Sequence, residues 1–166
     1  MNIEDTASSS IYDKGLDTEE LDKTIDLDID PRRYNDWEIK EHKKGGQFKW
    51  DSAKVDLFLH DKQLVGGITG KKLRKKIAHI ETFNVNLLDY LLANPSLIPD
   101  NWKVDENGET CYIFFWGTVY YRPSDQGLYV RCLYFNVGKW REDYRSIDYP
   151  WSANRFAIIH KGGTPV

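Results

Sequence analysis

Five cationic side chains occupy six consecutive positions near the middle of the chain. They are Lys71, Lys72, Arg74, Lys75 and Lys76. Side chains of this type bind phosphate oxygens, and several such contacts give strong, salt-dependent affinity for nucleic acid. Leu73 and Ile77 stand four residues apart in the same segment, which is also typical of an amphipathic helix whose basic face is simply solvated. The run therefore predicts either a nucleic-acid contact or an exposed helix face.

A second group of candidates mixes aromatic and charged side chains toward the C-terminus. The residues expected to bind a protein partner are Trp140, Arg141, Tyr144, Arg145, Tyr149 and Trp151. Tyr, Trp and Arg are enriched at binding hot spots. A wider set could stack nucleic-acid bases, namely Tyr120, Tyr121, Arg122, Tyr129, Arg131, Trp140 and Arg141. The alternative for both sets is that these aromatics fill the core of a sheet.

Catalytic and metal-binding patterns are weak. The histidines are His42, His60, His79 and His160, and none belongs to an H-E-x-x-H motif or a Cys/His zinc spacing. We therefore expect no catalytic residue, no metal and no cofactor, and an enzyme that pairs His60 or His79 with a carboxylate is only a third hypothesis. The segment Gly66–Gly70 precedes a helix and could hold an anion, but it lacks the P-loop spacing and is interpreted as a hinge.

The two cysteines are too few for a disulfide framework. If the loop between their strands is centred near Ser124, Cys111 lies opposite about Val137 rather than Cys132, so no disulfide is expected. No apolar run is long enough for a transmembrane helix, and the first ten residues lack the features of a secretory signal. These observations predict a cytoplasmic protein without a membrane partner.

The elements that must position these residues begin with short helices. Asp51 is a good N-cap, and the residues after it suit either a helix face or an alternating strand; we favour a short helix. Thr69 is expected to cap a basic helix from Gly70 to about Ala78. Asn84 is expected to cap an apolar helix that ends at Asn94-Pro95, because the residue before proline avoids the helical region.

An aromatic β-meander follows the helices. Cys111–Tyr121 is rich in β-formers on both faces, which is typical of a central strand. Residues 122–127 form a hairpin loop, and Leu128–Asn136 is the partner strand. After a turn at residues 136–139, Trp140–Ile147 is a third, more charged strand that suits the edge of the sheet. Phe156, Ile158 and Ile159 form a last apolar patch.

Charge divides the chain in two. Residues 1–36 carry eleven acidic and four basic side chains, whereas residues 37–166 carry fifteen acidic and nineteen basic. The first segment is interpreted as an acidic, flexible tail that could serve as a second contact arm. Ile25 and Leu27 alternate with Asp26 and Asp28, so a strand is the alternative. Residues 37–166 are interpreted as one α+β domain.

Several short segments occur in an order that resembles a known group of proteins. They are Asp51–Leu59, the basic stretch 71–76, His79-Ile80, Leu97-Ile98-Pro99, Trp102-Lys103, Ile113-Phe114-Phe115, Gly117-Thr118-Val119, Tyr129-Val130, Leu133-Tyr134 and Gly138-Lys139-Trp140. From Phe48 onward the chain resembles an uncharacterised family of small bacterial proteins of the candidate-phylum type. The resemblance implies a shared fold and transfers no activity or site residue. This chain departs from the group after Trp140, and its acidic N-terminus lies outside the match.

Together these patterns predict an α+β fold in which two or three short N-terminal helices cover one face of a three- to four-stranded antiparallel β-meander. The leading functional hypothesis is a non-enzymatic protein-interaction module whose partner is another protein, bound by the sheet surface and the acidic arm. The alternative is a nucleic-acid-binding protein that uses residues 71–76.

Overall fold

The computed structural model describes residues 24–162, and a seven-stranded sheet forms its centre. The longest strand is β8 (Gly127–Asn136). One edge of β8 pairs with β9 (Lys139–Ser146), and the other edge pairs with both β6 (Tyr112–Phe114) and β7 (Thr118–Arg122). The β8–β9 hairpin and the charged third strand are therefore confirmed, and β9 pairs only with β8 among the described residues.

The sheet is larger than the sequence predicted because segments from both ends of the chain join it. The last strand, β11 (Arg155–His160), lies parallel to β6 and antiparallel to β4 (Val55–Phe58). The strand β2 (Glu38–His42) pairs with the far edge of β7. The prediction of an α+β fold is confirmed, but the prediction of three to four strands is wrong, because the long-range partners of β6 and β7 leave no local signature.

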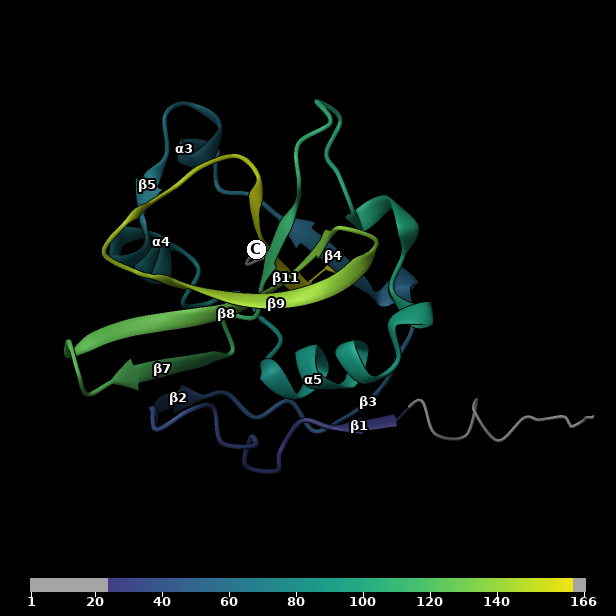
Figure 1. Ribbon diagram of the computed structural model, residues 1–166, viewed down its shortest axis with the longest axis horizontal. Coiled ribbons are helices and arrows are strands. Elements are labelled where there is room, and N and C mark those ends of the chain that lie inside the picture. Colours follow the sequence, from purple (N-terminus) through teal and green to yellow (C-terminus); the bar gives the residue numbers. More distant parts are fainter. Residues whose placement is uncertain (1–23, 163–166) are drawn as a thin grey trace, which may run out of the picture.

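The sheet is covered on both faces (Figure 1). On one face lie α5 (Val85–Ala93) and a ribbon of β1 (Thr24–Asp26) with β3 (Gln47–Lys49). On the other lie α4 (Gly70–Lys76) and a ribbon of β5 (Ile68–Thr69) with β10 (Pro150–Trp151). The expectation that the helices share one face is therefore wrong.

The helix caps largely follow the sequence. Thr69 accepts a hydrogen bond from the Lys72 amide at the start of α4, and Asn84 accepts one from the Asn86 amide at the start of α5. Asp51 also caps, but it caps a single 3₁₀ turn, η1 (Ser52–Lys54), and the chain then enters β4. The expected helix after Asp51 is replaced by the alternative strand because β4 gains β11 as a partner.

Short elements complete the chain. The helix α3 (Asp61–Leu64) precedes β5, and the 3₁₀ turns η2 (Pro95–Leu97) and η3 (Asp100–Trp102) follow α5. Ile98 and Trp102 are buried against α5 in the same hydrophobic cluster. Within residues 24–162, no helix is long and apolar enough to cross a membrane.

A three-residue excursion divides the predicted strand Cys111–Tyr121 into β6 and β7. Phe114 lies opposite Cys132, and Tyr120 lies opposite Tyr129. Five residues on the β6–β7 side therefore face only two on β8, so residues 115–117 are extra. Extra residues of this kind act as an enlarged β-bulge and bend the strand.

The excursion reverses the alternation of side chains between the faces of the sheet. Successive residues of a strand point to opposite faces, so an odd insertion exchanges the two sets. Ile113 before the excursion and Tyr120 after it both belong to the cluster under α5. Phe114 and Val119 both belong to the cluster under α4. An unbroken strand would place Val119 with Ile113 and Tyr120 with Phe114, so simple alternation fails for the residues after the excursion.

Gly117 fixes the excursion against the segment that leads into α5. Its amide donates to the Phe83 carbonyl at 2.9 Å, and its carbonyl accepts from the Lys43 amide at 2.7 Å. A Cβ atom at this position would lie 2.7 Å from both the Phe83 carbonyl oxygen and the Asn84 amide nitrogen. Only glycine allows the two backbones to approach this closely.

The N-terminal segment belongs to the folded unit from Thr24 onward. Ile25 and Leu27 are buried, and the Asn84 side chain donates to the Leu27 carbonyl at 2.9 Å. The predicted tail of residues 1–36 is therefore too long at its C-terminal end, and the strand alternative holds for β1. Residues 1–23 lie outside the described residues.

Gly117→Ala is expected to destabilise the protein by about 2 kcal/mol or more, because backbone must move to admit the methyl group. Gly46→Ala is the matched control: its φ is +72° and nothing lies within 4 Å, so it carries only backbone strain of about 1 kcal/mol. Urea unfolding followed by tryptophan fluorescence measures both. An equal loss in the two variants would contradict the tight contact at Gly117.

Two histidines link stability to pH. His42 lies within hydrogen-bond distance of the Thr118 hydroxyl and the Ile29 carbonyl, and His160 stacks on Phe83 with ring centroids 3.9 Å apart. Burial lowers the pKa of both imidazoles from the ordinary 6.5. Because the folded state favours the neutral rings, this contribution to stability is complete above pH 6.5 and is lost as the pH falls toward the folded pKa values.

The free energy of unfolding is therefore expected to decrease between about pH 7.5 and about pH 5.5. His160→Phe keeps the ring stack and removes one titrating group, so its stability should decrease less over the same interval. Urea midpoints at the two pH values measure the difference. Identical pH dependence in the variant and the parent would rule out a contribution from His160.

Candidate functional site

The basic helix α4 is held rigidly on the sheet. Leu73 and Ile77 are buried, as predicted. The Gly70 amide donates to the Tyr149 carbonyl at 3.0 Å, and the Lys71 amide donates to the Ile147 carbonyl at 2.8 Å. The first turn of α4 is thus tied to the loop between β9 and β10, and the exposed face of the helix has a fixed direction.

A cavity of about 520 Å³ lies between this helix and the β2–β7 edge of the sheet. We call it the Trp116 cavity. Its lining residues are Glu41, Lys43, Lys71, Arg74, Lys75, Ile77, Ala78, Trp116, Leu128 and Ile147. The floor is apolar and the rim is charged, a combination typical of sites that bind a ligand with an anionic and an apolar part.

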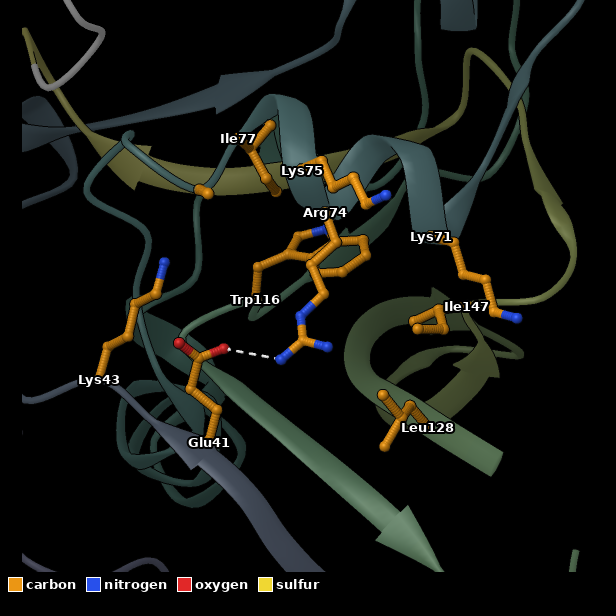
Figure 2. Close-up of a pocket in the computed structure, with 10 residues that line it drawn as sticks. Glu41, Lys43, Lys71, Arg74, Lys75, Ile77, Trp116, Leu128 and Ile147 are labelled. Carbon is orange, nitrogen blue, oxygen red and sulfur yellow. Dashed lines mark hydrogen bonds and ion pairs between the residues drawn. The ribbon is translucent and has the colours of Figure 1, made fainter. Parts of the chain in front are cut away.

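Four cations stand on the rim of the Trp116 cavity. Lys43 and Lys71 lie on opposite sides of it, and the ion pair between Arg74 and Glu41 lies between them (Figure 2). Arg74 Nη2 is 3.1 Å from Glu41 Oε1. Glu41 is the only carboxylate in the lining, so the rim has a clear positive excess.

Trp116 forms part of the floor and lies on the same face of the sheet as Phe114, two residues before it. It is only 3% exposed and packs against Trp151 with ring centroids 4.9 Å apart. Its Nε1 is buried and has no hydrogen-bond partner among the described residues. Buried donors are nearly always satisfied, so this indole is an unmet donor in the wall of a cavity.

A second cavity, of about 720 Å³, lies on the other side of α4. We call it the Gly67 cavity. It is lined by Lys62, Gly66, Gly67, Ile68, Thr69, Lys72, Lys75, Lys76 and Pro150. No acidic side chain belongs to this lining, and Lys75 lines both cavities.

The two cavities together gather seven cationic side chains around one helix. They are Lys43, Lys62, Lys71, Lys72, Arg74, Lys75 and Lys76. Lys71 has an ion pair with Asp148 at 3.1 Å, between two exposed side chains. Among the described residues, Lys43, Lys62, Lys72, Lys75 and Lys76 have no carboxylate within 4.0 Å. Their charges are therefore not neutralised by a nearby carboxylate, and they contribute to a positive electrostatic potential in the surrounding solvent.

Every residue of the predicted basic run lies at one of the two cavities. Sequence reasoning missed Glu41, Lys43, Lys62 and Trp116, which reach the site from other elements. Trp116 had a usable signal: an isolated glycine in a strand pattern, here Gly117, suggests a bulge or a close backbone approach. The other three have no signal, because only the pairing of β2 with β7 and the turn after α3 bring them near α4.

Four of the residues predicted to bind a protein lie on β9 and divide between its two faces. Trp140 packs against Phe135 and the cluster under α5, with ring centroids 5.3 Å apart. Tyr144 shares that face and is 37% exposed; it contacts Tyr34 and Trp37. Both rings thus lie against the folded body rather than standing free.

The remaining members of this group have local partners. Arg141 donates to the Asn136 carbonyl at 2.9 Å, and Arg145 donates to the Pro150 carbonyl at 2.6 Å. Tyr149 is exposed and lies beside the Arg145 guanidinium. Trp151 is fully buried, so it is not available to a partner. The structure therefore does not gather the six residues into one surface.

The wider base-stacking set also belongs largely to the interior. Tyr120, Tyr129 and Arg131 are buried. Arg122 pairs with Asp125 at 2.6 Å and lies over the Tyr129 ring. The alternative, that these aromatics build the core, explains their positions.

Arg131 is the most enclosed charge among the described residues, with no exposed surface. It bonds to Glu142 of β9 and lies 3.2 Å from Asp89 of α5, while its guanidinium stacks over the Tyr34 ring at 4.3 Å. Burial opposes its charge, but Asp89 and Tyr120 hold the pKa of the guanidinium above its ordinary range. Burial and the nearby Glu142 raise the pKa of Tyr34 to about 12.

Arg32 covers this network from outside, at 3.4 Å from Asp89 and 3.6 Å from Glu142. The network ties the N-terminal segment, α5 and the two strands β8 and β9 into one contact. Its charges balance, two guanidinium groups against two carboxylates, so we interpret it as structural.

The hypothesis of an enzyme that pairs His60 or His79 with a carboxylate receives no support from the positions of these residues. His60 caps α3, where its Nδ1 accepts from the Lys62 amide at 3.1 Å. His79 is exposed in the turn after α4, and neither histidine lines the Trp116 or the Gly67 cavity. Within the part of the chain that the structure describes, no three His, Cys, Asp or Glu side chains gather as metal ligands would. Cys111 and Cys132 are buried free thiols.

Arg131→Met is expected to destabilise the protein by about 2–4 kcal/mol, because Asp89 and Glu142 would lose their buried partner. Arg32→Met, at an exposed site of the same network, should cost under about 1 kcal/mol. Urea unfolding measures both. Adding Asp89→Asn and Glu142→Gln to Arg131→Met should recover part of the loss; no recovery would mean that packing, not charge, explains the role of Arg131.

Comparison of the chain with known protein families, with curated proteins and with solved structures finds no match. The resemblance to small bacterial proteins drawn from the sequence stays a prediction. The case for a function of this chain therefore rests on the geometry and charge around α4.

Proposed function

We propose that this protein binds nucleic acid, mainly through contacts with the phosphate backbone. The contacts would be made by the seven cationic side chains at the two cavities beside α4, which we call the α4 surface. The observation that carries the proposal is the convergence of seven cationic side chains, with one carboxylate, on the two cavities beside a single helix. Such a concentration of positive charge attracts a polyanion and releases its condensed counterions.

The solvated-helix alternative does not account for all of these charges. Leu73 and Ile77 explain why the other residues of α4 face outward, since a helix that buries one stripe exposes the rest. They do not explain why Lys43, which follows β2, and Lys62, from α3, approach the same helix from either side. Convergence from three elements favours a binding surface.

The contacts available on the exposed surface are with phosphate. The cations are mostly lysines on flexible stems, which act as point charges rather than as readers of base edges. Affinity should therefore depend steeply on salt and weakly on sequence.

The test is the binding of a fluorescein-labelled single-stranded oligonucleotide, followed by fluorescence anisotropy. If about four phosphates are contacted, affinity should fall roughly 50-fold between about 50 mM and about 200 mM salt. Lys72→Gln with Lys75→Gln removes two exposed cations without breaking an ion pair, so it should weaken binding about tenfold or more and flatten the salt dependence. Lys49→Gln, an exposed lysine on β3 across the sheet, is the matched control and should bind like the parent.

A substitution of Glu41 is expected to strengthen binding, whereas the lysine substitutions weaken it. In a phosphate-binding rim its carboxylate repels the ligand and holds Arg74, so Glu41→Gln should increase affinity severalfold at low salt. The ion pair is partly exposed, and its loss should leave stability nearly unchanged. Weaker binding by Glu41→Gln, or no binding by the parent at low salt, would contradict the proposal.

The acidic segment 1–23 must be controlled for, since its seven acidic and two basic side chains can compete with the ligand. The appropriate deletion ends at residue 23, because Ile25 and Leu27 belong to the core. No shift in anisotropy for the deleted chain at low salt would rule out nucleic-acid binding.

Protein binding through β9 stays a second proposal. Its supporting observation is that β9 pairs on one side only among the described residues. However, the Tyr144 amide is bonded to the Asp143 carboxylate at 2.8 Å, and the strand carries several charges, features that discourage the addition of another strand. The α4 surface is therefore better supported.

A further inference from the structure

We infer that the Trp116 cavity receives one unpaired nucleobase, so that the ligand of the α4 surface is single-stranded nucleic acid rather than a duplex. This inference rests on the proposed function and names its substrate class. It is carried by features of the Trp116 cavity that binding to phosphate alone does not require.

The first feature is an apolar floor. Ile77, Leu128 and Ile147 lie with Trp116 beneath the charged rim. A volume of about 520 Å³ is ample for one base with its sugar and falls within the usual range of small-molecule sites. A phosphate group alone gains nothing from an apolar floor, whereas a base removes its own apolar faces from water there.

The second feature is the set of polar groups at the cavity. Arg74 brings guanidinium donors to the opening, where Glu41 holds it from the facing element (Figure 2). Trp116 Nε1 adds a buried donor without a partner. Donors and acceptors set in apolar surroundings are what orients a base within a pocket.

The third feature is the position of the cations around the opening. Lys43 and Lys71 stand on opposite sides of the Trp116 cavity (Figure 2). A strand whose base enters the cavity passes its preceding and following phosphates over these two sides. The Gly67 cavity, with Lys62, Lys72 and Lys76, continues the positive surface beyond α4.

A duplex cannot use this cavity at low cost. Its bases are paired and stacked, and removing one costs a few kcal/mol. A base of a single strand is not paired, so it can enter the cavity without this cost. The α4 surface can still attract a duplex through phosphate contacts, so the prediction concerns the difference between the two forms.

The experiment compares three labelled ligands of equal length at low salt: a single-stranded oligonucleotide, the same sequence as a duplex, and a single strand of abasic sites with the same phosphates. The parent should bind the first ligand about tenfold more tightly than the abasic strand. Ala78→Trp places a bulky side chain at an exposed position of the cavity lining without changing charge. It should lower affinity for the single strand to about that for the abasic strand and leave the other two affinities nearly unchanged.

Ala93→Trp adds the same bulk at the exposed end of α5 on the opposite face and should bind like the parent. Equal binding of the single-stranded and abasic ligands, or an unaltered single-strand affinity in Ala78→Trp, overturns the inference and leaves the proposed function intact. Failure of all three ligands to bind the parent overturns the proposed function itself. Urea unfolding of Ala78→Trp confirms that the variant is folded before its affinity is compared.

Discussion

The close contact between Gly117 and the Phe83–Asn84 backbone governs the architecture on both sides of the sheet. The excursion at residues 115–117 interrupts the pairing with β8, and the missing Cβ lets Gly117 lie directly on the chain that starts α5. Thr118 then accepts from the Val85 amide at 3.1 Å, so the strand that follows the excursion also helps to cap that helix. One insertion thus joins the centre of the sheet, the α5 N-terminus and the β2 edge, because Lys43 bonds to the same glycine.

The same insertion creates the conditions for the candidate site. It contains Trp116, which lines the cavity beneath α4 on the same face as Phe114, and because its length is odd it exchanges the faces only of the residues that follow it. The break in the strand therefore borders the cavity through Trp116.

Much of the local structure could be predicted from the sequence, and most of the tertiary structure could not. Thr69, Asn84 and the Asn94-Pro95 pair mark helix ends through hydrogen-bond and steric rules that act within a few residues. Gly138 marks the turn between β8 and β9 by a similar local rule, since glycine adopts positive φ freely, whereas Val137 has a positive φ that its residue type does not favour. By contrast, the partners of β4, β2 and β11 lie up to about a hundred residues away, and apolar runs alone do not choose between a helix and a strand.

The candidate site shows the same division. The basic run is visible at once because its residues are adjacent in sequence, whereas Glu41, Lys43 and Lys62 join it only through the fold. The sequence suggested Arg131 as a cation that could stack on bases. In the structure it lies on β8 between α5 and β9, where it forms buried ion pairs with Asp89 and Glu142. The sequence shows which side chains are charged. It does not show whether a charged side chain faces solvent or a carboxylate, because the fold decides that.

The position of β11 has a consequence for how the chain acquires its structure during synthesis. β11 lies between β4 and β6, whose residues precede it by many positions, and its residues Ala157, Ile158 and Ile159 are buried. Until a ribosome has released residues 155–160, β4 has no strand to join and β6 has only one of its two neighbours. The emerging chain must therefore hold β4 unpaired until residues 155–160 have emerged, and a product that stops before them would leave β4 and one edge of β6 without a partner.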